Sequence, residues 1–145
     1  MKIESPVFGD HERIPDKYTC DGADISPPLS FHDVPLGCKT LAIVVDDPDA
    51  PAGTFDHWVV WNIPSETIGL TEDRSVGTMG INGFNKLTYK GPCPPKGSDH
   101  RYFFKLYALD TFIELPPGSS KEELEKAMES HIMAKAELVG TYGRS

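Results

Sequence analysis

The stretch Thr40-Leu41-Ala42-Ile43-Val44-Val45-Asp46 decides the fold class. It is a short apolar run, rich in β-branched side chains, and such a run predicts a strand that is buried on both faces. The run ends at Asp46-Asp47-Pro48-Asp49-Ala50-Pro51-Ala52-Gly53, where neither a strand nor a helix can continue because proline fixes the backbone and Asp favours turns. The predicted strand therefore ends in a stiff, acidic loop.

Four further segments have strand character. His57–Ile63 (HWVVWNI) is closed by a proline, and Lys86–Lys90 (KLTYK) alternates polar and apolar side chains. Tyr102–Leu109 (YFFKLYAL) gives the strongest signal because aromatic residues favour the pleated, half-buried surface of a sheet. Leu138–Tyr142 (LVGTY) is expected to be the last strand.

One helix is predicted, late in the chain. Ser119 and Glu122 have the spacing of a capping box, and they follow a Pro-Pro-Gly turn. Leu124, Met128 and Ile132 then recur at every fourth position, which predicts one apolar stripe facing the core.

Short strands with a single late helix favour one domain, residues 1–145, with the architecture of a β-sandwich decorated by a helix. A parallel βαβ fold fits poorly, because no helical crossovers lie between the early strands. No internal repeat, low-complexity segment or long linker divides the chain.

The charge balance limits the partners. The chain has 14 basic and 22 acidic side chains and a formal net charge of −8, so it lacks the basic footprint that nucleic acid or an anionic bilayer requires. No apolar stretch approaches the ~20 residues needed to cross a membrane. The amino terminus has no signal-peptide pattern, so a cytoplasmic protein without membrane insertion is expected.

Polar residues gather at predicted strand ends, where a rigid scaffold displays binding groups. Asp47 and Asp49 follow one strand, His57 opens the next, and His100 and Tyr102 open another. Histidine N–H groups and a tyrosine hydroxyl can bind an anion, and nearby carboxylates favour a protonated imidazole. The cluster therefore predicts an anion pocket in a binding protein with no catalytic role and no cofactor.

Two other hypotheses use the same cluster. Two histidines with Asp can hold a metal, but the HxH, HxxxH and HExxH spacings are absent. A hydrolase needs a nucleophile, and no GxSxG elbow is present. A hydrolase or metal-dependent enzyme stays as the alternative to a binding protein.

Several motifs in a fixed order resemble the phosphatidylethanolamine-binding protein family, which includes the Raf kinase inhibitor proteins. Asp47-Pro48-Asp49-Ala50-Pro51 is similar to its DPDAP signature, and Pro94-Pro95-Lys96-Gly97 running into His100-Arg101-Tyr102 is similar to its second signature. His57–Pro64 (HWVVWNIP) lies between them. The flanking segments look like the bacterial and archaeal Raf kinase inhibitor-like branch.

The resemblance implies an antiparallel Greek-key β-sandwich with one or a few peripheral helices. It also implies a pocket for phosphate, acetate or a phosphoethanolamine headgroup, and a cis peptide near that pocket. The ligand-binding residues implied are Asp47, Asp49, His57, Pro94, Pro95, His100 and Tyr102, and Arg101 is expected to anchor the motif through an ion pair.

Family membership would suggest an inhibitor of a kinase or of a serine protease, but the chain lacks the long C-terminal extension with which animal members contribute to kinase regulation. The oligomeric state stays open, a homodimer included. The pairing of the three cysteines also stays open. Cys20, Cys38 and Cys93 have no CxxC or metal-ligand spacing, which favours reduced thiols, whereas Cys20 and Cys93 belong to segments expected near the same pocket, where a disulfide would be compatible.

Overall fold

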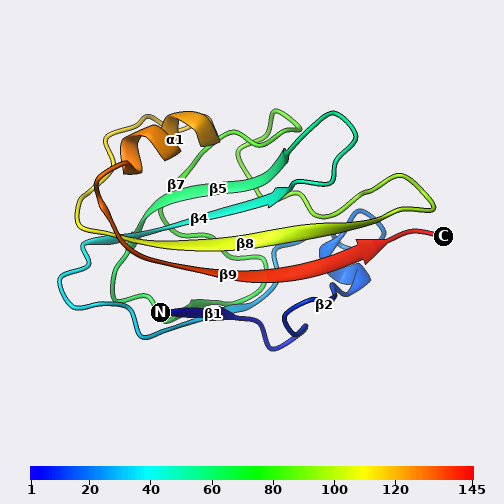
Figure 1. The fold of residues 1–145 in the computed structure, drawn as a ribbon, viewed down its shortest axis with the longest axis horizontal. Helices are drawn as coiled ribbons and strands as arrows, with labels where there is room; N and C mark the ends of the chain where they lie inside the picture. The colour runs from blue at the N-terminus through cyan, green and yellow to red at the C-terminus, as the bar shows by residue number, and fades with distance from the viewer.

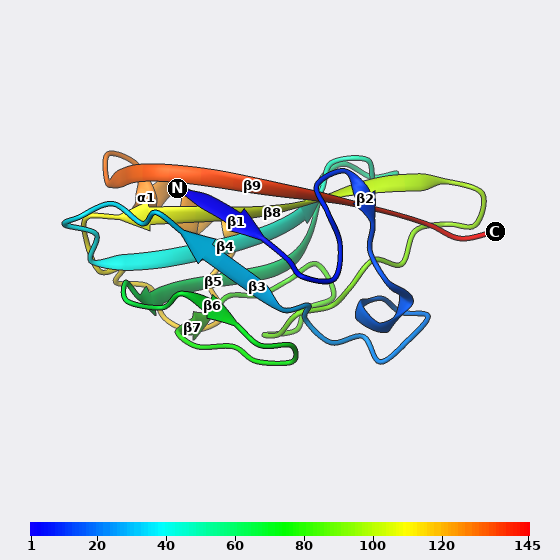
Figure 2. The same ribbon diagram turned by 90° about the horizontal axis from the view of Figure 1, so that it is seen from below.

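The computed structural model describes all 145 residues, and it has two packed β-sheets with one α-helix on the outside (Figures 1 and 2). The larger sheet has the spatial order β2 (Glu12–Arg13), β9 (Ile132–Gly143), β8 (Asp99–Leu109), β4 (Thr40–Asp47), β5 (Phe55–Pro64) and β7 (Thr78–Met79). The smaller sheet has the order β1 (Lys2–Glu4), β3 (Leu29–His32) and β6 (Gly69–Leu70). Neighbouring strands are antiparallel except β2, which runs parallel to β9. The predicted β-sandwich is confirmed.

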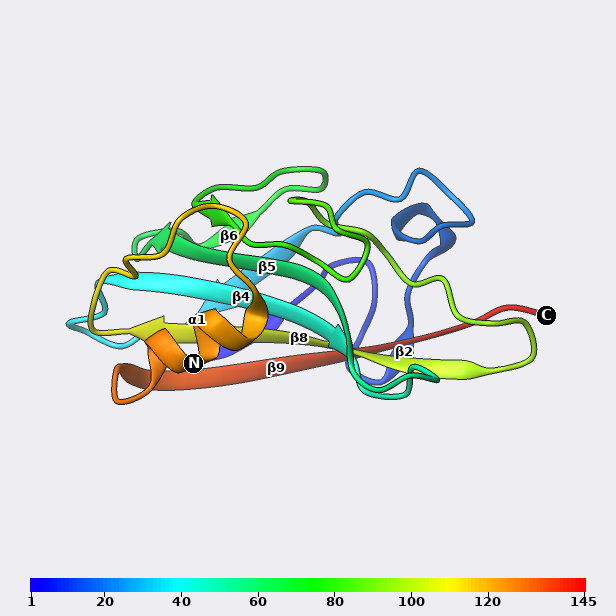
Figure 3. The same ribbon diagram turned by 90° about the horizontal axis from the view of Figure 1, so that it is seen from above.

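β4 is buried along its whole length because both of its faces are covered. Leu41, Ile43 and Val45 belong to the core between the two sheets. Ala42 and Val44 belong to a second core on the opposite face, which includes side chains of the helix α1 (Lys121–Met128). Figure 3 shows α1 lying over the larger sheet. The apolar run of residues 40–45 thus needs no polar face, as its sequence predicts.

The helix begins one residue later than the sequence predicts. Ser120 is the N-cap: its side chain accepts from the backbone N–H of Glu123, and the Glu123 side chain accepts from the backbone N–H of Ser120. The predicted pair of Ser119 and Glu122 is therefore wrong by one position. Ser119 instead donates its hydroxyl hydrogen to the carbonyl of Pro116, 2.7 Å away, which closes the preceding turn.

The apolar stripe of the helix is shorter than predicted. Leu124 and Met128 are buried against the sheet, but α1 ends at Met128. Ile132 is exposed and begins β9, which runs twelve residues to Gly143 instead of the five predicted. Strand pairing with β8 overrides the helical spacing here.

The predicted strand at Lys86–Lys90 does not form. Asn82 organises this segment instead: its amide nitrogen donates to the carbonyl of Thr88, and its oxygen accepts from the backbone N–H groups of Phe84 and Lys86. The segment is a loop stabilised by a side chain, and its Phe84 packs against Phe55 at the start of β5.

The structure differs from the family expectation in one backbone detail, because it contains no cis peptide bond. The second helical element, η1 (Asp16–Tyr18), is a single 3-10 turn. Neither helical element has the length and apolar character required to cross a membrane.

Candidate ligand-binding site

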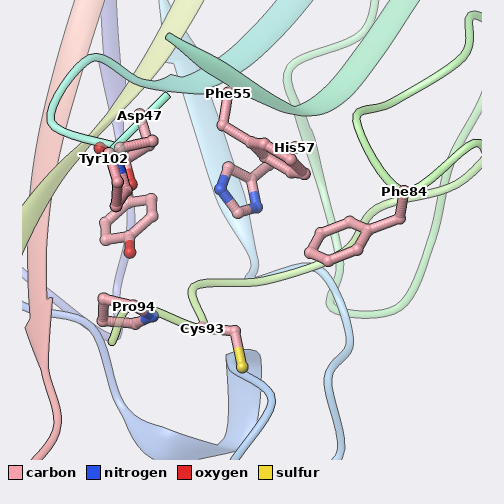
Figure 4. A pocket seen from close by; sticks show the side chains of 9 residues that line it. Asp47, Phe55, His57, Phe84, Cys93, Pro94 and Tyr102 are labelled. Atoms are coloured by element: carbon pink, nitrogen blue, oxygen red, sulfur yellow. The ribbon is translucent and has the colours of Figure 1, made fainter. Parts of the chain in front are cut away.

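A cavity of about 160 Å³ opens at the end of the sandwich where β4 ends and where β5 and β8 begin (Figure 4). Three strands and the loops β4–β5 and β7–β8 contribute to its lining: Asp47, Ala50, Pro51, Phe55, His57, Phe84, Cys93, Pro94 and Tyr102. No lysine or arginine is among these residues, so any positive charge within the cavity has to come from His57.

A β-bulge directs His57 into the cavity. Val45 pairs with Trp58, and Asp46 pairs with Asp56, so β5 has one extra residue at His57. Two consecutive side chains, His57 and Trp58, therefore lie on the inner side of the sheet, which strict alternation forbids. Without the bulge, alternation counted from Trp58 would turn His57 toward the α1 face.

The His57 ring is fixed in one orientation. Its Nδ1 lies 2.7 Å from the carbonyl oxygen of Lys90, and because a carbonyl can only accept, Nδ1 carries the proton. In the neutral ring Nε2 is then an unprotonated acceptor, and Figure 4 shows this side of the ring directed toward Asp47 and Tyr102. Burial lowers the pKa of His57, and the hydrogen bond to Lys90 and the charge of Asp47 oppose this only in part.

Asp47, which lines the cavity, forms a buried pair with His100 behind it. The Nδ1 atom of His100 lies 2.6 Å from Oδ2 of Asp47, and both side chains are less than a tenth exposed. The other oxygen, Oδ1, accepts from the backbone N–H of Asp49 at 2.8 Å. Both carboxylate oxygens are therefore engaged, which reduces the repulsion that Asp47 would exert on an anion.

Asp49 faces away from the cavity and binds Arg101. Its Oδ2 accepts from both the backbone N–H and the Nε–H of Arg101, and its Oδ1 accepts from Nη2 at 2.8 Å. The side-chain hydrogen bonds from Arg101 lower the pKa of Asp49 to about 2. The expected ion pair of Arg101 with an acidic neighbour is confirmed, and the neighbour is itself a residue of the first signature.

Aromatic rings make up much of the remaining wall. Tyr102 and Phe55 lie on either side of His57, with ring centroids 5.3 and 5.2 Å from the imidazole. Phe84 packs edge-on against Phe55 at 4.8 Å and is partly exposed at the mouth. Burial and the nearby charge of Asp47 raise the pKa of Tyr102, so its hydroxyl stays protonated and able to donate.

The last wall is formed by the segment Gly91–Gly97, here called the wall loop. A disulfide joins its Cys93 to Cys20, which follows η1, and the Cα atoms of the two residues are 5.4 Å apart. Cys38 has a free thiol. The structure thus chooses between the two alternatives that the sequence leaves open for Cys20 and Cys93.

Four of the seven predicted site residues line the cavity, namely Asp47, His57, Pro94 and Tyr102. His100 and Asp49 lie behind it and hold Asp47 and Arg101, and Pro95 is exposed on the wall loop.

Five lining residues are not among the predicted ones, namely Ala50, Pro51, Phe55, Phe84 and Cys93. Phe55 precedes His57 by two positions, so alternation along the strand could have found it, but Phe84 belongs to no pattern.

The side chains around the cavity can also be compared with what a metal-dependent enzyme or a hydrolase requires. No group of three or more His, Cys, Asp or Glu side chains is arranged to hold a metal ion. The lining contains no serine or threonine, and the sulfur of its single cysteine is bonded to Cys20. The Asp47–His100 pair thus has no serine, threonine or free cysteine beside it in the cavity, and the hydroxyl in the lining is that of Tyr102.

The comparisons with known proteins agree with this architecture. A family model described as phosphatidylethanolamine-binding protein matches residues 4–143. Relatives named UPF0098 protein include one from Methanothermobacter thermautotrophicus, 50% identical over 99% of both chains. Another, from Pyrococcus horikoshii, is 51% identical over 99% of this chain and 77% of its own length.

Solved structures give the same result. A Chlamydia trachomatis protein described as a putative phosphatidylethanolamine-binding protein homologue superposes with a TM-score of 0.95 at 41% identity, covering 99% of this chain and 97% of the other. YbcL of E. coli, described as a member of the mammalian family, has a TM-score of 0.92 at 31% identity, with 99% and 98% covered. The chain belongs to the phosphatidylethanolamine-binding protein family, and this membership indicates a small binding protein.

Proposed function

We propose that the cavity binds a small oxyanion, such as phosphate or the phosphate end of a phosphoethanolamine-like headgroup, and that His57 takes up a proton as the anion binds. The observation behind the proposal is the fixed tautomer of His57. Its Nδ1–H is used by the Lys90 carbonyl, so the ring can only accept at Nε2 until a second proton arrives. A protonated His57 would then supply both a donor and the single positive charge in the lining.

Two other groups can contribute donors. The Tyr102 hydroxyl points toward Pro94 at the far side of the cavity (Figure 4). The backbone N–H of Cys93 donates to no acceptor within the protein. The apolar walls around Phe55 and Phe84 suit the hydrocarbon part of a headgroup, because they strengthen polar contacts at the base by excluding water.

The test is calorimetric titration with phosphate, phosphoethanolamine and sulfate at pH 6 and pH 8. Sulfate is the sharper probe, because its charge does not change in this range and any pH effect belongs to the protein. Stronger sulfate binding at pH 6 is expected. His57→Ala should weaken binding by about tenfold or more, the size of a lost hydrogen bond to a charged group. His32→Ala, which removes a half-exposed histidine on β3, a strand that contributes nothing to the cavity lining, is the matched control. No heat with any of the three anions would contradict the proposal.

A protein target remains a separate prediction. The hypothesis of a serine-protease inhibitor is tested by assaying chymotrypsin-like enzymes with a large excess of this protein, and unchanged proteolysis would contradict it. The hypothesis of a kinase inhibitor is tested by assaying a Raf-like kinase in the same way, and unchanged kinase activity would contradict it. Cytoplasmic location and a homodimer likewise stay predictions.

A further inference from the structure

The wall loop lacks the hydrogen bonds that usually hold a binding loop in place. Three of its seven residues are prolines, which have no backbone N–H. Of the remaining donors, Cys93 and Lys96 make no hydrogen bond within the protein. Its own backbone donors are used only at its two ends: Gly91 donates to Asp24 at 2.7 Å, and Gly97 donates to the Arg144 carbonyl at 2.7 Å.

Between these ends the carbonyl groups accept one ordinary hydrogen bond and two long ones, one of the long ones being that of Pro95 from the backbone N–H of Ser98 at 3.4 Å. Pro92 accepts from the backbone N–H of Cys20 at 3.1 Å, and Pro94 receives a long contact of 3.5 Å from the Arg144 guanidinium. Apart from the Pro92–Cys20 hydrogen bond and the burial of Pro94, the disulfide is therefore the main link that positions the two cavity-lining residues of this loop, Cys93 and Pro94.

The other end of the disulfide is firmly held. Thr19, next to Cys20, is fully buried, and its hydroxyl donates to the Asp16 carbonyl. The Tyr18 carbonyl accepts the hydroxyl hydrogen of Tyr89 at 2.8 Å. Breaking the bond would therefore release the wall loop and leave the segment around Cys20 in place. Both cysteines are exposed, so a reductant can reach the bond.

We infer that the Cys20–Cys93 disulfide is a redox latch that sets the ligand affinity of the cavity. The inference rests on the proposed function, because it names the regulation of the same site. A dithiol supplies two electrons and two protons, the S–S bond breaks, Cys20 and Cys93 become thiols, and the dithiol becomes a disulfide. In the oxidised form the bond holds Cys93 and Pro94 in the binding position. In the reduced form these residues become ordered only when the ligand binds, and the entropy lost in that ordering lowers the affinity.

The experiment measures sulfate and phosphoethanolamine binding by the oxidised protein, the dithiol-reduced protein and Cys20→Ser. Cys20→Ser breaks the bond without changing a lining residue. An affinity about tenfold lower is expected in both bond-free forms, which corresponds to about 1.4 kcal/mol. Cys38→Ser is the matched control, and its response to reduction should equal that of the wild type. Far-UV circular dichroism checks each form, and loss of the spectrum on reduction would overturn the inference, since the bond would then hold the whole fold.

Amide hydrogen exchange separates this inference from the proposed function. Faster exchange on reduction is expected at Gly97 and at Cys20, whose backbone N–H groups donate to Arg144 and to Pro92 of the wall loop, and with Thr19 unchanged it supports the latch. Equal affinities in the two redox states overturn it and leave the proposed function intact. Absence of anion binding in both redox states contradicts the proposed function. It also contradicts the claim that the disulfide controls the affinity, because there is then no affinity to control. Unchanged exchange would then show that the bond does not position the loop either.

Discussion

Asp49 and Arg101 join the two signature motifs of the chain through three hydrogen bonds of 2.8 to 2.9 Å. The pair lies at the outer side of the site, with Arg101 half exposed, and it fixes the loop after β4 to the start of β8. Its effect on the cavity is indirect: the same loop supplies Ala50 and Pro51 to the lining.

The first prediction concerns this pair. Asp49→Asn should lower the melting temperature slightly at pH 5 and weaken anion binding slightly. The pKa of Asp49 is about 2 in the folded state, below its ordinary value of 3.8. The stabilisation is therefore complete above pH 3.8 and disappears as the pH falls toward 2. Thermal unfolding at pH 5 and pH 2 should show the wild type and Asp49→Asn converging at the lower pH. Glu66→Gln, at an exposed acidic residue, is the control, and a constant difference between wild type and Asp49→Asn would contradict the prediction.

The second prediction is proton uptake on binding. Burial lowers the pKa of His57, so the free cavity holds a neutral ring at pH 7, and a bound anion favours the protonated ring. Sulfate titrations in buffers of different ionisation enthalpy should therefore show uptake approaching about one proton per anion. His57→Gln should abolish the uptake. The same number of protons in wild type and His57→Gln would assign the uptake to another group.

The third prediction concerns the buried charges beneath α1. Lys121 contacts Asp56 at 2.9 Å and Asp46 at 3.4 Å, and Asp46 is almost fully buried. Burial opposes the charge of Lys121, but these two carboxylates outweigh it and raise the pKa. Lys121→Met should cost about 3 kcal/mol in the free energy of unfolding, because it removes the ion-pair partner of the partly buried Asp56 and one of the two partners of the buried Asp46.

Urea unfolding measures that loss. Lys126→Met removes an exposed lysine from the same helix and should change the free energy of unfolding little. Equal effects of the two substitutions would mean that Lys105, the other partner of Asp46, suffices to compensate the buried charge.

The fourth prediction concerns stability without the disulfide. Cys20 and Cys93 are 73 positions apart, and a loop of this length gives the bond a chain-entropy stabilisation of about 4 kcal/mol. Reduction should lower the urea midpoint accordingly in wild type. The urea midpoint of Cys20→Ser should already lie below that of the oxidised wild type, and reduction should not lower it further. A midpoint that does not move on reduction of the wild type would show that the constraint on the unfolded chain contributes little.

The fifth prediction distinguishes two neighbouring candidates for the helix cap. Ser120→Ala should cost about 1 kcal/mol because it removes the N-cap acceptor used by Glu123. Glu122→Ala should be nearly neutral, since its side chain is exposed and forms no cap. Chemical denaturation of the two variants settles the register, and the opposite order would favour the cap that spacing alone predicts.

Most of the fold is predictable from local patterns. The β-branched run before Asp46 and the aromatic run from Tyr102 both become central strands, because each buries side chains on two faces. The helix is also predictable, but its first residue is not. Two adjacent serines both fit a cap, and the choice depends on a turn that Ser119 closes with Pro116.

The site is predictable in composition and less so in its arrangement. Motif spacing brings His57 and Asp47 to one end of the sheet, but the bulge that turns His57 inward leaves no mark on the sequence HWVVW. The different roles of Asp46 and Asp47 follow from opposite faces of one strand, which requires knowledge of what covers each face. The disulfide depends on a distance between segments 73 positions apart, and no local pattern reports it.

The contact between Gly97 and Arg144 has a practical consequence for handling the protein. The last residues of the chain lie against the wall loop, whereas the amino terminus lies toward the other end of the sandwich (Figure 1). An affinity tag fused after Ser145 would emerge beside the binding cavity and crowd it. A tag before Met1 would leave the cavity clear, so the purification strategy itself decides whether weak ligands can be detected.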